Sequence, residues 1–192
     1  LGIENVSGSE AGDFLLGTTD ANILNGGGGD DVIEGRGGND TLIGGAGFDG
    51  VVFGNVGVGV TVNLSITTAQ NTGAGTMVIS GFEVLDGSLL NDTLIGDGNG
   101  NRLFGGGGDD TLIGGAGADD LRGSISATNG DTASYLTSLA GVNVSLVANV
   151  VGSGGDAAGD TLTGIENLIG SALGDTLTGD GGNNIIEGRG GA

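Results

Sequence analysis

Acidic residues recur along this 192-residue chain at a spacing of nine. When the frame starts at Gly8, the sixth residue of each nine-residue unit is an aspartate or asparagine, and the eighth is aliphatic. The sixth residues are Asp13, Asn22, Asp31, Asp40 and Asp49 in a first block, Asp92, Asn101, Asp110 and Asp119 in a second, and Asp175 and Asn184 in a third. Carboxylate and carbonyl oxygens are the ligands that hard divalent cations prefer, so the spacing predicts a series of metal sites.

The absence of histidine and cysteine restricts the other chemistry open to the chain. It excludes Ser-His and Cys-His nucleophiles, cysteine and histidine zinc sites, and disulfides. Paired carboxylates remain, and a glycosidase needs two of them about 5 to 10 Å apart in a cleft. We expect the aspartates to be committed to metal, and only 3% of the residues are aromatic and able to stack on sugars. The sequence therefore predicts no catalytic residue in this chain, while the activity of a longer parent protein stays open.

Two other patterns have ordinary explanations. The glycine runs Gly26–Gly29 and Gly105–Gly108 resemble phosphate-binding loops, but neither leads into a helix with the required lysine. Threonines beside the strand core are typical of ice-binding ladders, and they are Thr41, Thr93, Thr111 and Thr176. Val32, Arg102 and Asp120 occupy the same place in other units and interrupt the series. We interpret these threonines as ordinary β-sheet surface residues.

The composition is not that of an ordinary globular core. The chain has 48 glycines, no proline and a net charge of −20, with no lysine and four arginines. Chains with high net charge and few aromatic residues stay disordered because they bury too little apolar surface to offset the entropy of ordering. Cations that neutralise the aspartates would change this balance. The same charge argues against nucleic acid as a partner and against anionic lipid, and no apolar run is long enough for membrane insertion.

The nine-residue pattern is most complete in residues 26–34, Gly-Gly-Gly-Gly-Asp-Asp-Val-Ile-Glu, and in residues 44–49, Gly-Gly-Ala-Gly-Phe-Asp. These units resemble the calcium-binding nonapeptide of the repeats-in-toxin (RTX) family, and the resemblance covers roughly two thirds of the chain. Glycine permits positive φ and close backbone approach, so that a short loop turns its carbonyl oxygens inward. The resemblance implies an all-β fold, a parallel β-roll (a right-handed two-sheet solenoid) with several Ca²⁺ ions in the turns. Two units complete one coil, and the aliphatic eighth residues form a thin core.

The resemblance also implies how the ligands pair. The second and fourth carbonyls and the aspartate of one loop face the first and third carbonyls and the aspartate of the loop eighteen residues later. Transferred here, Gly27, Gly29 and Asp31 face Gly44, Ala46 and Asp49. Ser9, Ala11 and Asp13 face Gly26, Gly28 and Asp31, and Ser88, Leu90 and Asp92 face Gly105, Gly107 and Asp110. The candidate ligands are Asp13, Gly26, Gly27, Gly28, Gly29, Asp31, Gly35, Gly37, Asp40, Gly44, Ala46, Asp49, Asp92, Gly105, Gly107, Asp110, Gly114, Ala116, Asp119 and Asp175.

The candidate sites are not expected to be equal. The pairs Asn22 with Asp40 and Asn101 with Asp119 carry one charge less, and we expect them to be weaker or empty. Asp31 is shared between two expected ions, so we expect its replacement to be the most damaging.

The nonapeptide blocks belong to a longer repeat of about eighty residues, with heads at residues 2–6, 81–85 and 164–168. We divide the array into a first block (1–55), a β insertion (56–80), a second block (81–131), a second insertion (132–163) and a third block (164–192) that is truncated. Alternating valines predict half-buried strands in both insertions, without a topology. Asp131, Asp156 and Asp160 are further ligand candidates near the second insertion. We expect the array to be a fragment that continues past Ala192.

These features predict a chain that folds when calcium binds. The family resemblance implies a secreted bacterial protein, exported unfolded by a type I system, which folds outside the cell or at the cell surface. The three long repeats favour a structural, adhesive or surface-assembly role, with self-association through the ends or edges of the roll. The alternative is a C-terminal stabilising or secretion module of an extracellular protease, lipase or toxin.

Overall fold

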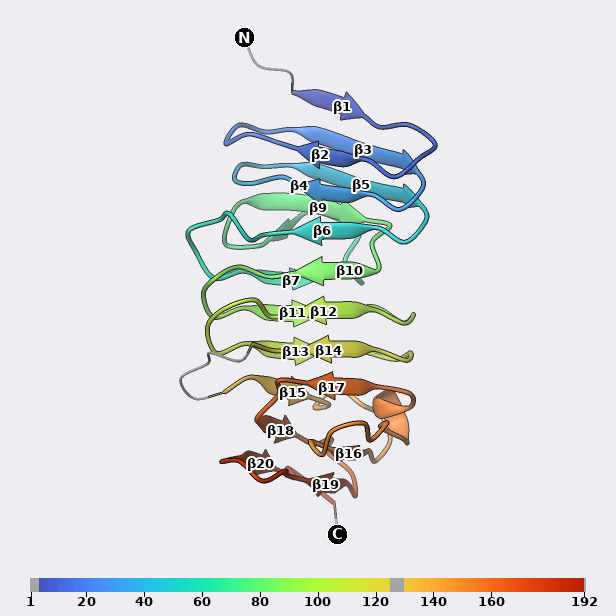
Figure 1. Cartoon of the computed structure of the whole chain (residues 1–192), viewed down its shortest axis with the longest axis vertical. Helices are drawn as coiled ribbons and strands as arrows, with labels where there is room; N and C mark the ends of the chain where they lie inside the picture. Colours follow the sequence, from blue (N-terminus) through green and yellow to red (C-terminus); the bar gives the residue numbers. More distant parts are fainter. Residues whose placement is uncertain (1–3, 125–129, 192) are drawn as a thin grey trace.

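The computed structural model describes residues 4–124 and 130–191. These residues form an elongated stack of short strands with the two chain ends at opposite ends of the stack (Figure 1). Most strands are three residues long, and one turn of 3-10 helix, η1, covers Gly155–Ala157. No helix in the described part of the chain is long and apolar enough to cross a membrane.

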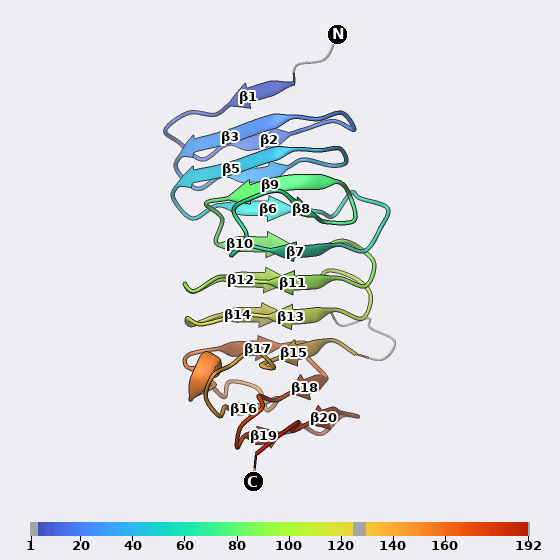
Figure 2. The same ribbon diagram turned by 180° about the vertical axis from the view of Figure 1, so that it is seen from behind.

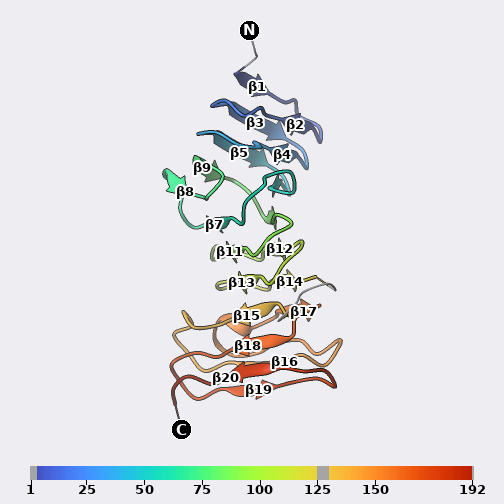
Figure 3. The same ribbon diagram turned by 90° about the vertical axis from the view of Figure 1, so that its left-hand side faces the viewer.

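Two faces of the stack are made of parallel strands. One face carries a first sheet and, below it, a third; the opposite face carries the second sheet (Figure 3). The first sheet contains β1 (Asn5–Ser7), β3 (Ile23–Gly28), β5 (Thr41–Ala46), β9 (Thr76–Ser80) and β8 (Gln70–Asn71), of which only β8 is antiparallel. The second contains β2 (Phe14–Leu16), β4 (Val32–Glu34), β6 (Gly50–Val52), β10 (Val84–Asp86), β12 (Arg102–Phe104), β14 (Asp120–Arg122) and β17 (Thr161–Thr163). The third contains β7 (Thr61–Asn63), β11 (Thr93–Ile95), β13 (Thr111–Ile113), β15 (Thr132–Ser134), β18 (Asn167–Ile169) and β20 (Ile185–Glu187). A separate parallel pair consists of β16 (Asn143–Ser145) and β19 (Thr176–Thr178).

Neighbouring nonapeptide strands of one sheet are eighteen residues apart. Leu24 pairs with Leu42 in the first sheet, and Leu94 pairs with Leu112 in the third. Successive nonapeptides therefore alternate between the two faces, and two of them complete one coil (Figure 2). This arrangement confirms the predicted all-β parallel β-roll.

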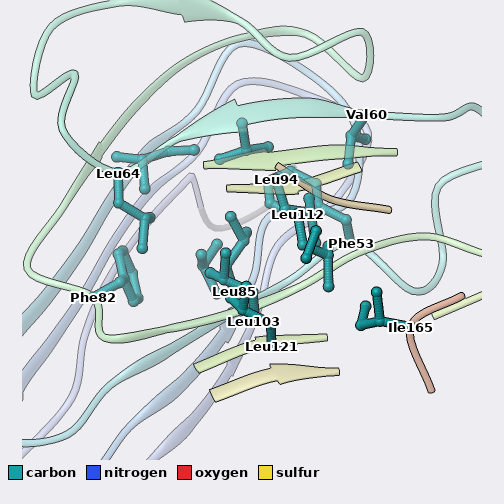
Figure 4. Close-up of a cluster of buried hydrophobic side chains, with 14 of the residues drawn as sticks. Phe53, Val60, Leu64, Phe82, Leu85, Leu94, Leu103, Leu112, Leu121 and Ile165 are labelled. Atoms are coloured by element: carbon teal, nitrogen blue, oxygen red, sulfur yellow. The ribbon is translucent and has the colours of Figure 1, made fainter. Parts of the chain in front are cut away.

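The eighth residues of the units in the first two blocks form much of the core between the two faces, whereas Ile186 in the third block is exposed. Leu85, Leu103 and Leu121 stack along the second sheet and face Leu94 and Leu112 of the third (Figure 4), and all five are fully buried. Burial of one such side chain contributes about 1.5 to 3 kcal/mol. Because side chains alternate in direction along a strand, only one residue of each three-residue strand enters the core. The core is consequently a narrow aliphatic seam that cannot bury the loops.

Each insertion contributes three strands to the stack: β7, β8 and β9 lie in the first, and β15, β16 and β17 lie in the second. In the first, β7 pairs with β11, and the Thr61 N–H donates to the carbonyl of Thr72 (3.0 Å). In the second, β16 pairs with β19, and the Asn143 N–H donates to the carbonyl of Ser153 (2.7 Å). The first insertion follows β6 of the second sheet, whereas the second insertion begins with β15, the corresponding strand, in the third sheet. Equivalent insertions therefore leave the roll from opposite faces.

Candidate metal centre

The turns between strands bring main-chain carbonyl groups of adjacent coils together. Gly27 and Gly45, the second residues of their loops, have φ of 104° and 120°, in the region that favours glycine. A Cβ atom built on Gly45 would overlap with the carbonyl oxygen of Gly27, and one on Gly47 would overlap with that of Gly29. The second and fourth carbonyls of one loop therefore point toward the loop of the next coil.

The first and third carbonyls of the next loop point back. A Cβ atom on Gly26 would lie 2.5 Å from the carbonyl oxygen of Gly44 and would overlap with Oδ2 of Asp31. The carbonyl of Ala46 accepts a hydrogen bond from the Gly29 N–H (2.9 Å). The structure thus brings together the two loops that the sequence paired, and the space between them is lined by oxygen atoms that only glycine leaves accessible.

A ladder of carboxylates runs along the same edge. The Oδ1 atom of an aspartate accepts a hydrogen bond from the main-chain N–H of the residue eighteen positions earlier. These bonds join Asp13 to Asp31 (2.7 Å), Asn22 to Asp40 (2.9 Å), Asp31 to Asp49 (2.8 Å), Asp92 to Asp110 (2.8 Å) and Asn101 to Asp119 (2.8 Å). One carboxylate oxygen of each acid is therefore used in holding the coils together.

The second carboxylate oxygen is often buried without a partner. Among the described residues, the Oδ2 atoms in this state are those of Asp31, Asp40, Asp49, Asp110, Asp119 and Asp175. Except for Asp175, these residues are at most 2% exposed. A buried polar atom without a hydrogen bond is costly, and a buried charge is more so. Such oxygens, set among inward-facing carbonyls, fit a hard divalent cation.

The raised pKa values of these aspartates are also consistent with a cation site between the loops. Burial, together with the nearby carboxylates of Asp131 and Asp92, raises the pKa of Asp110 to about 7, although a hydrogen bond from the Asp92 N–H opposes this rise. Burial likewise raises the pKa of Asp119 to about 7, with Asp160 adding to the effect. The pKa values of Asp40 and Asp49 are also raised, mainly by burial. A cation between the loops would stabilise the ionised form of these carboxylates and lower their pKa values.

The candidate ligands form two kinds of loop. We call residues 26–31, 35–40, 44–49, 105–110 and 114–119 the glycine-rich loops, and all five contain an unpartnered Oδ2 atom. We call residues 8–13, 17–22, 87–92 and 96–101 the leading loops, because they open the first two blocks. Their aspartate or asparagine side chains are hydrogen-bonded within the loop.

Serine supplies this internal pairing in the first leading loop of each block. The Ser9 N–H and hydroxyl donate to Asp13 Oδ2 (2.6 and 3.0 Å). The Ser88 hydroxyl donates to Asp92 Oδ1 (2.8 Å) and the Ser88 N–H to Asp92 Oδ2. In the third block Ser171 donates to Asp175 Oδ1 (2.7 Å), which leaves Oδ2 unpartnered. The predicted sites at Asp13 and Asp92 therefore contain carboxylates that already have partners.

Asparagine distinguishes the second leading loop of each block. Oδ1 of Asn22 accepts the Thr18 N–H (2.7 Å), and Oδ1 of Asn101 accepts the Asp97 N–H (2.7 Å). Nδ2 of Asn101 is buried without an acceptor. An amide nitrogen is a donor and cannot ligate a cation. This geometry supports the expectation of weaker sites here, which stays a prediction.

Acidic residues outside the nonapeptides extend the ladder across the insertions. Oδ1 of Asp131 accepts the Asp110 N–H (2.8 Å), and Oδ1 of Asp160 accepts the Asp119 N–H (2.9 Å). Asp160 Oδ2 accepts the Tyr135 hydroxyl (2.9 Å), and burial raises the pKa of Asp160 to about 6. Asp156, the other acid named from the sequence, contributes its charge to Asp160.

Two glutamates in the ladder were not predicted. Oε2 of Glu83 accepts the Asp49 N–H (2.9 Å), and Oε2 of Glu166 accepts the Asp131 N–H (2.8 Å). The sequence signal is the Gly-x-Glu tripeptide that recurs at the repeat heads.

The described residues contain no group of three or more acidic, histidine or cysteine side chains close enough to hold a metal by themselves. A ligand shell here must consist largely of main-chain carbonyls with one or two carboxylates, as calcium readily accepts. A comparison with known protein families also indicates calcium binding. The family model described as RTX calcium-binding nonapeptide repeat (4 copies) matches residues 6–51, 86–121 and 160–192. The chain belongs to this family. No curated protein matches it.

The RTX match identifies the hard cation as calcium, because these repeats bind calcium and form a structural rather than a catalytic unit. The family model does not match residues 52–85 and 122–159, which contain the first insertion, most of the second insertion and Glu83. The ligand assignments residue by residue rest on the loop geometry described above.

Proposed function

We propose that this RTX region belongs to a secreted bacterial protein and folds when it meets extracellular calcium. The buried, unpartnered carboxylate oxygens of the glycine-rich loops carry the proposal. Without cations, folding leaves these charges desolvated and close to one another, which opposes the small gain from the aliphatic seam. Because the ions bind the folded loops and not the extended chain, calcium shifts the equilibrium toward the roll.

The ligands we assign are the oxygens of paired loops one coil apart. Around Asp31 and Asp49 they are the carbonyls of Gly27, Gly29, Gly44 and Ala46. The glycine-rich loops orient these carbonyls, and the carboxylate ladder fixes the separation of the coils. Calcium, when bound, supplies the positive charge that allows the acidic loops to stack.

The expected calcium affinity suits a chain that moves from the cytosol to the outside of the cell. Extracellular calcium modules commonly have dissociation constants of about 10⁻⁴ to 10⁻³ M. Sites of this strength stay empty in the cytosol and fill outside the cell, so that the chain passes a type I exporter unfolded. RTX proteins are typically secreted, which supports an extracellular or cell-surface location.

A structural, adhesive or surface-assembly role fits the long repeat best. Equivalent insertions leave the roll from opposite faces, so successive repeats present the same structure on both sides of an extended object. Further copies of the chain are the partners we propose, through the ends or edges of the roll. The second candidate is a stabilising or secretion module appended to an extracellular protease, lipase or toxin. A catalytic domain in the same gene would favour that candidate.

Circular dichroism tests the calcium switch directly. The chain is expected to be largely unstructured in chelator and to gain β structure cooperatively in millimolar Ca²⁺. Mg²⁺ at the same concentration serves as the control, because its small octahedral shell fits a carbonyl-lined loop poorly. Equal β structure in chelator and in calcium would contradict the proposal. Light scattering under both conditions then shows whether the folded chains associate.

A further inference from the structure

The carboxylate ladder does not stop where the first block of nonapeptides ends. The Asp49 N–H donates to Oε2 of Glu83 (2.9 Å), thirty-four residues later in the chain. One coil earlier, the Asp31 N–H makes the corresponding bond to Oδ1 of Asp49 (2.8 Å). Glu83 therefore occupies the position in the ladder that an aspartate holds elsewhere.

A shortened loop explains why this acid is a glutamate. Ser80 pairs with Ile43 at the end of one strand, and Val84 pairs with Gly50 at the start of the next. Three residues, 81–83, thus span the turn that residues 44–49 span in six. The backbone of the shorter turn cannot reach as far, and the additional methylene of glutamate makes up part of the difference.

Oxygen atoms converge in this junction as they do in the nonapeptide loops. A Cβ atom on Gly44 would overlap with the carbonyl oxygen of Gly81 and would lie 2.9 Å from Oδ2 of Asp49. A Cβ atom on Gly81 would lie 3.5 Å from the carbonyl oxygen of Gly45. Asp49 is fully buried, and its Oδ2 atom has no hydrogen-bond partner. An unpartnered carboxylate oxygen is therefore directed into the space beside the Gly81 carbonyl.

The third repeat head, residues 164–168, contains the same Gly-x-Glu turn. The Asp131 N–H donates to Oε2 of Glu166 (2.8 Å), and a Cβ atom on Gly123 would overlap with the carbonyl oxygen of Gly164. The glutamate and its hydrogen bond are therefore a recurring feature of the long repeat.

We propose that Asp49 and Glu83, with the carbonyls of Gly45 and Gly81, bind a divalent hard cation, so that the row of ions continues across the insertion. The proposal rests on the calcium-dependent function proposed above and adds a site that the nonapeptide pattern does not contain. A glutamate with only a structural role would cap the Asp49 N–H without holding an ion, and the experiment must separate these roles.

Calcium counting on the full chain separates them. Equilibrium dialysis with Ca²⁺ alone gives the number of ions per chain for the wild type, Glu83→Gln and Glu83→Asp. Glutamine still accepts the Asp49 N–H but lacks the charge, and aspartate keeps the charge but is too short. We expect each variant to bind one ion fewer than the wild type. Glu187→Gln, an exposed glutamate outside the loops, is the matched control and is expected to bind the full number.

The outcomes distinguish this site from the wider function. Full stoichiometry in a Glu83→Gln variant that folds in calcium overturns the junction site and leaves the RTX function standing. A wild type that binds no calcium overturns the function itself. If the variants do not fold, anomalous scattering from a crystal of the wild type with calcium decides the matter. A calcium peak between Asp49 and Glu83 supports the site, and peaks in the nonapeptide loops without one there overturn it.

Discussion

The leading loops and the glycine-rich loops share one sequence pattern but differ in how their acidic groups are paired. Asp13 and Asp92 have hydrogen bonds from the serines of their own loops, whereas Asp31 and Asp110 each keep a buried oxygen without a partner. The difference arises at the second residue of the loop, where serine donates and glycine does not. We therefore propose that a nonapeptide needs a cation to the extent that its own loop leaves the carboxylate unpaired.

Replacement of Asp31 is expected to have the largest effect on calcium-dependent folding. Asp31→Ala removes the acceptor of the Asp13 N–H and a ligand shared by two expected ions. The lost hydrogen bond alone costs about 1 to 3 kcal/mol. We expect at least about a tenfold rise in the calcium concentration at half-folding, since each factor of ten corresponds to about 1.4 kcal/mol. Asp20→Ala, which removes an exposed acid, is the control for the calcium titration by circular dichroism. An unchanged midpoint in Asp31→Ala would refute the loop pairing.

Low pH should stabilise the roll in the absence of calcium, because protonation removes part of the charge that calcium otherwise neutralises. The pKa values of Asp110 and Asp119 are about 7 in the ion-free roll and near 3.8 in the unfolded chain. The folded state then binds more protons between these values, so the ion-free roll loses stability as pH rises from about 4 to 7. Structure in calcium-free buffer should therefore increase when the pH is lowered from 8 to 5. Asp110→Asn should flatten this dependence, and an unchanged pH dependence in that variant would contradict the prediction.

Replacing the asparagine of a leading loop by aspartate should create a calcium site of higher affinity. Asn101→Asp replaces a buried amide nitrogen that lacks an acceptor by a carboxylate opposite Asp119. We expect one additional or markedly tighter ion per chain in titration calorimetry, because the second carboxylate adds the charge that the asparagine lacks. The same ion number and affinity as in the wild type would show that the asparagine does not weaken this site.

The smallest expected effect comes from the serine itself. Ser88→Ala removes the hydroxyl bond to Asp92 Oδ1 but keeps the main-chain bond to Oδ2. We expect about 1 kcal/mol less stability at a calcium concentration just above the folding midpoint and a smaller loss at saturating calcium, because an ion compensates for the missing donor. Urea unfolding at these two calcium concentrations measures the two values. Equal losses would mean that serine and calcium do not substitute for each other.

Much of this architecture could be predicted because repeat folds are built from local contacts. The eighteen-residue coil, the buried eighth residues and the pairing of residues 26–31 with 44–49 all follow from the spacing. The unpaired carboxylates could not be identified in this way. Whether Oδ2 of Asp49 has a partner depends on the adjacent coil, which the chain reaches only after the insertion.

The sequence by itself determined the parallel roll and the chemistry of its edge, since the repeat closes each coil within eighteen residues. Tertiary structure decided on which face each block begins and how the insertions join the blocks: the first unit of the first block gives β2 in the second sheet, and that of the second block gives β11 in the third. Arg102 and Asp120, which interrupt the threonine series in the sequence, lie in the second sheet. On the other face, Thr61, Thr93, Thr111 and Thr132 pair in register across four strands. The physical reason is alternation: successive units go to opposite sheets, and each insertion places a strand beside residues distant in the sequence.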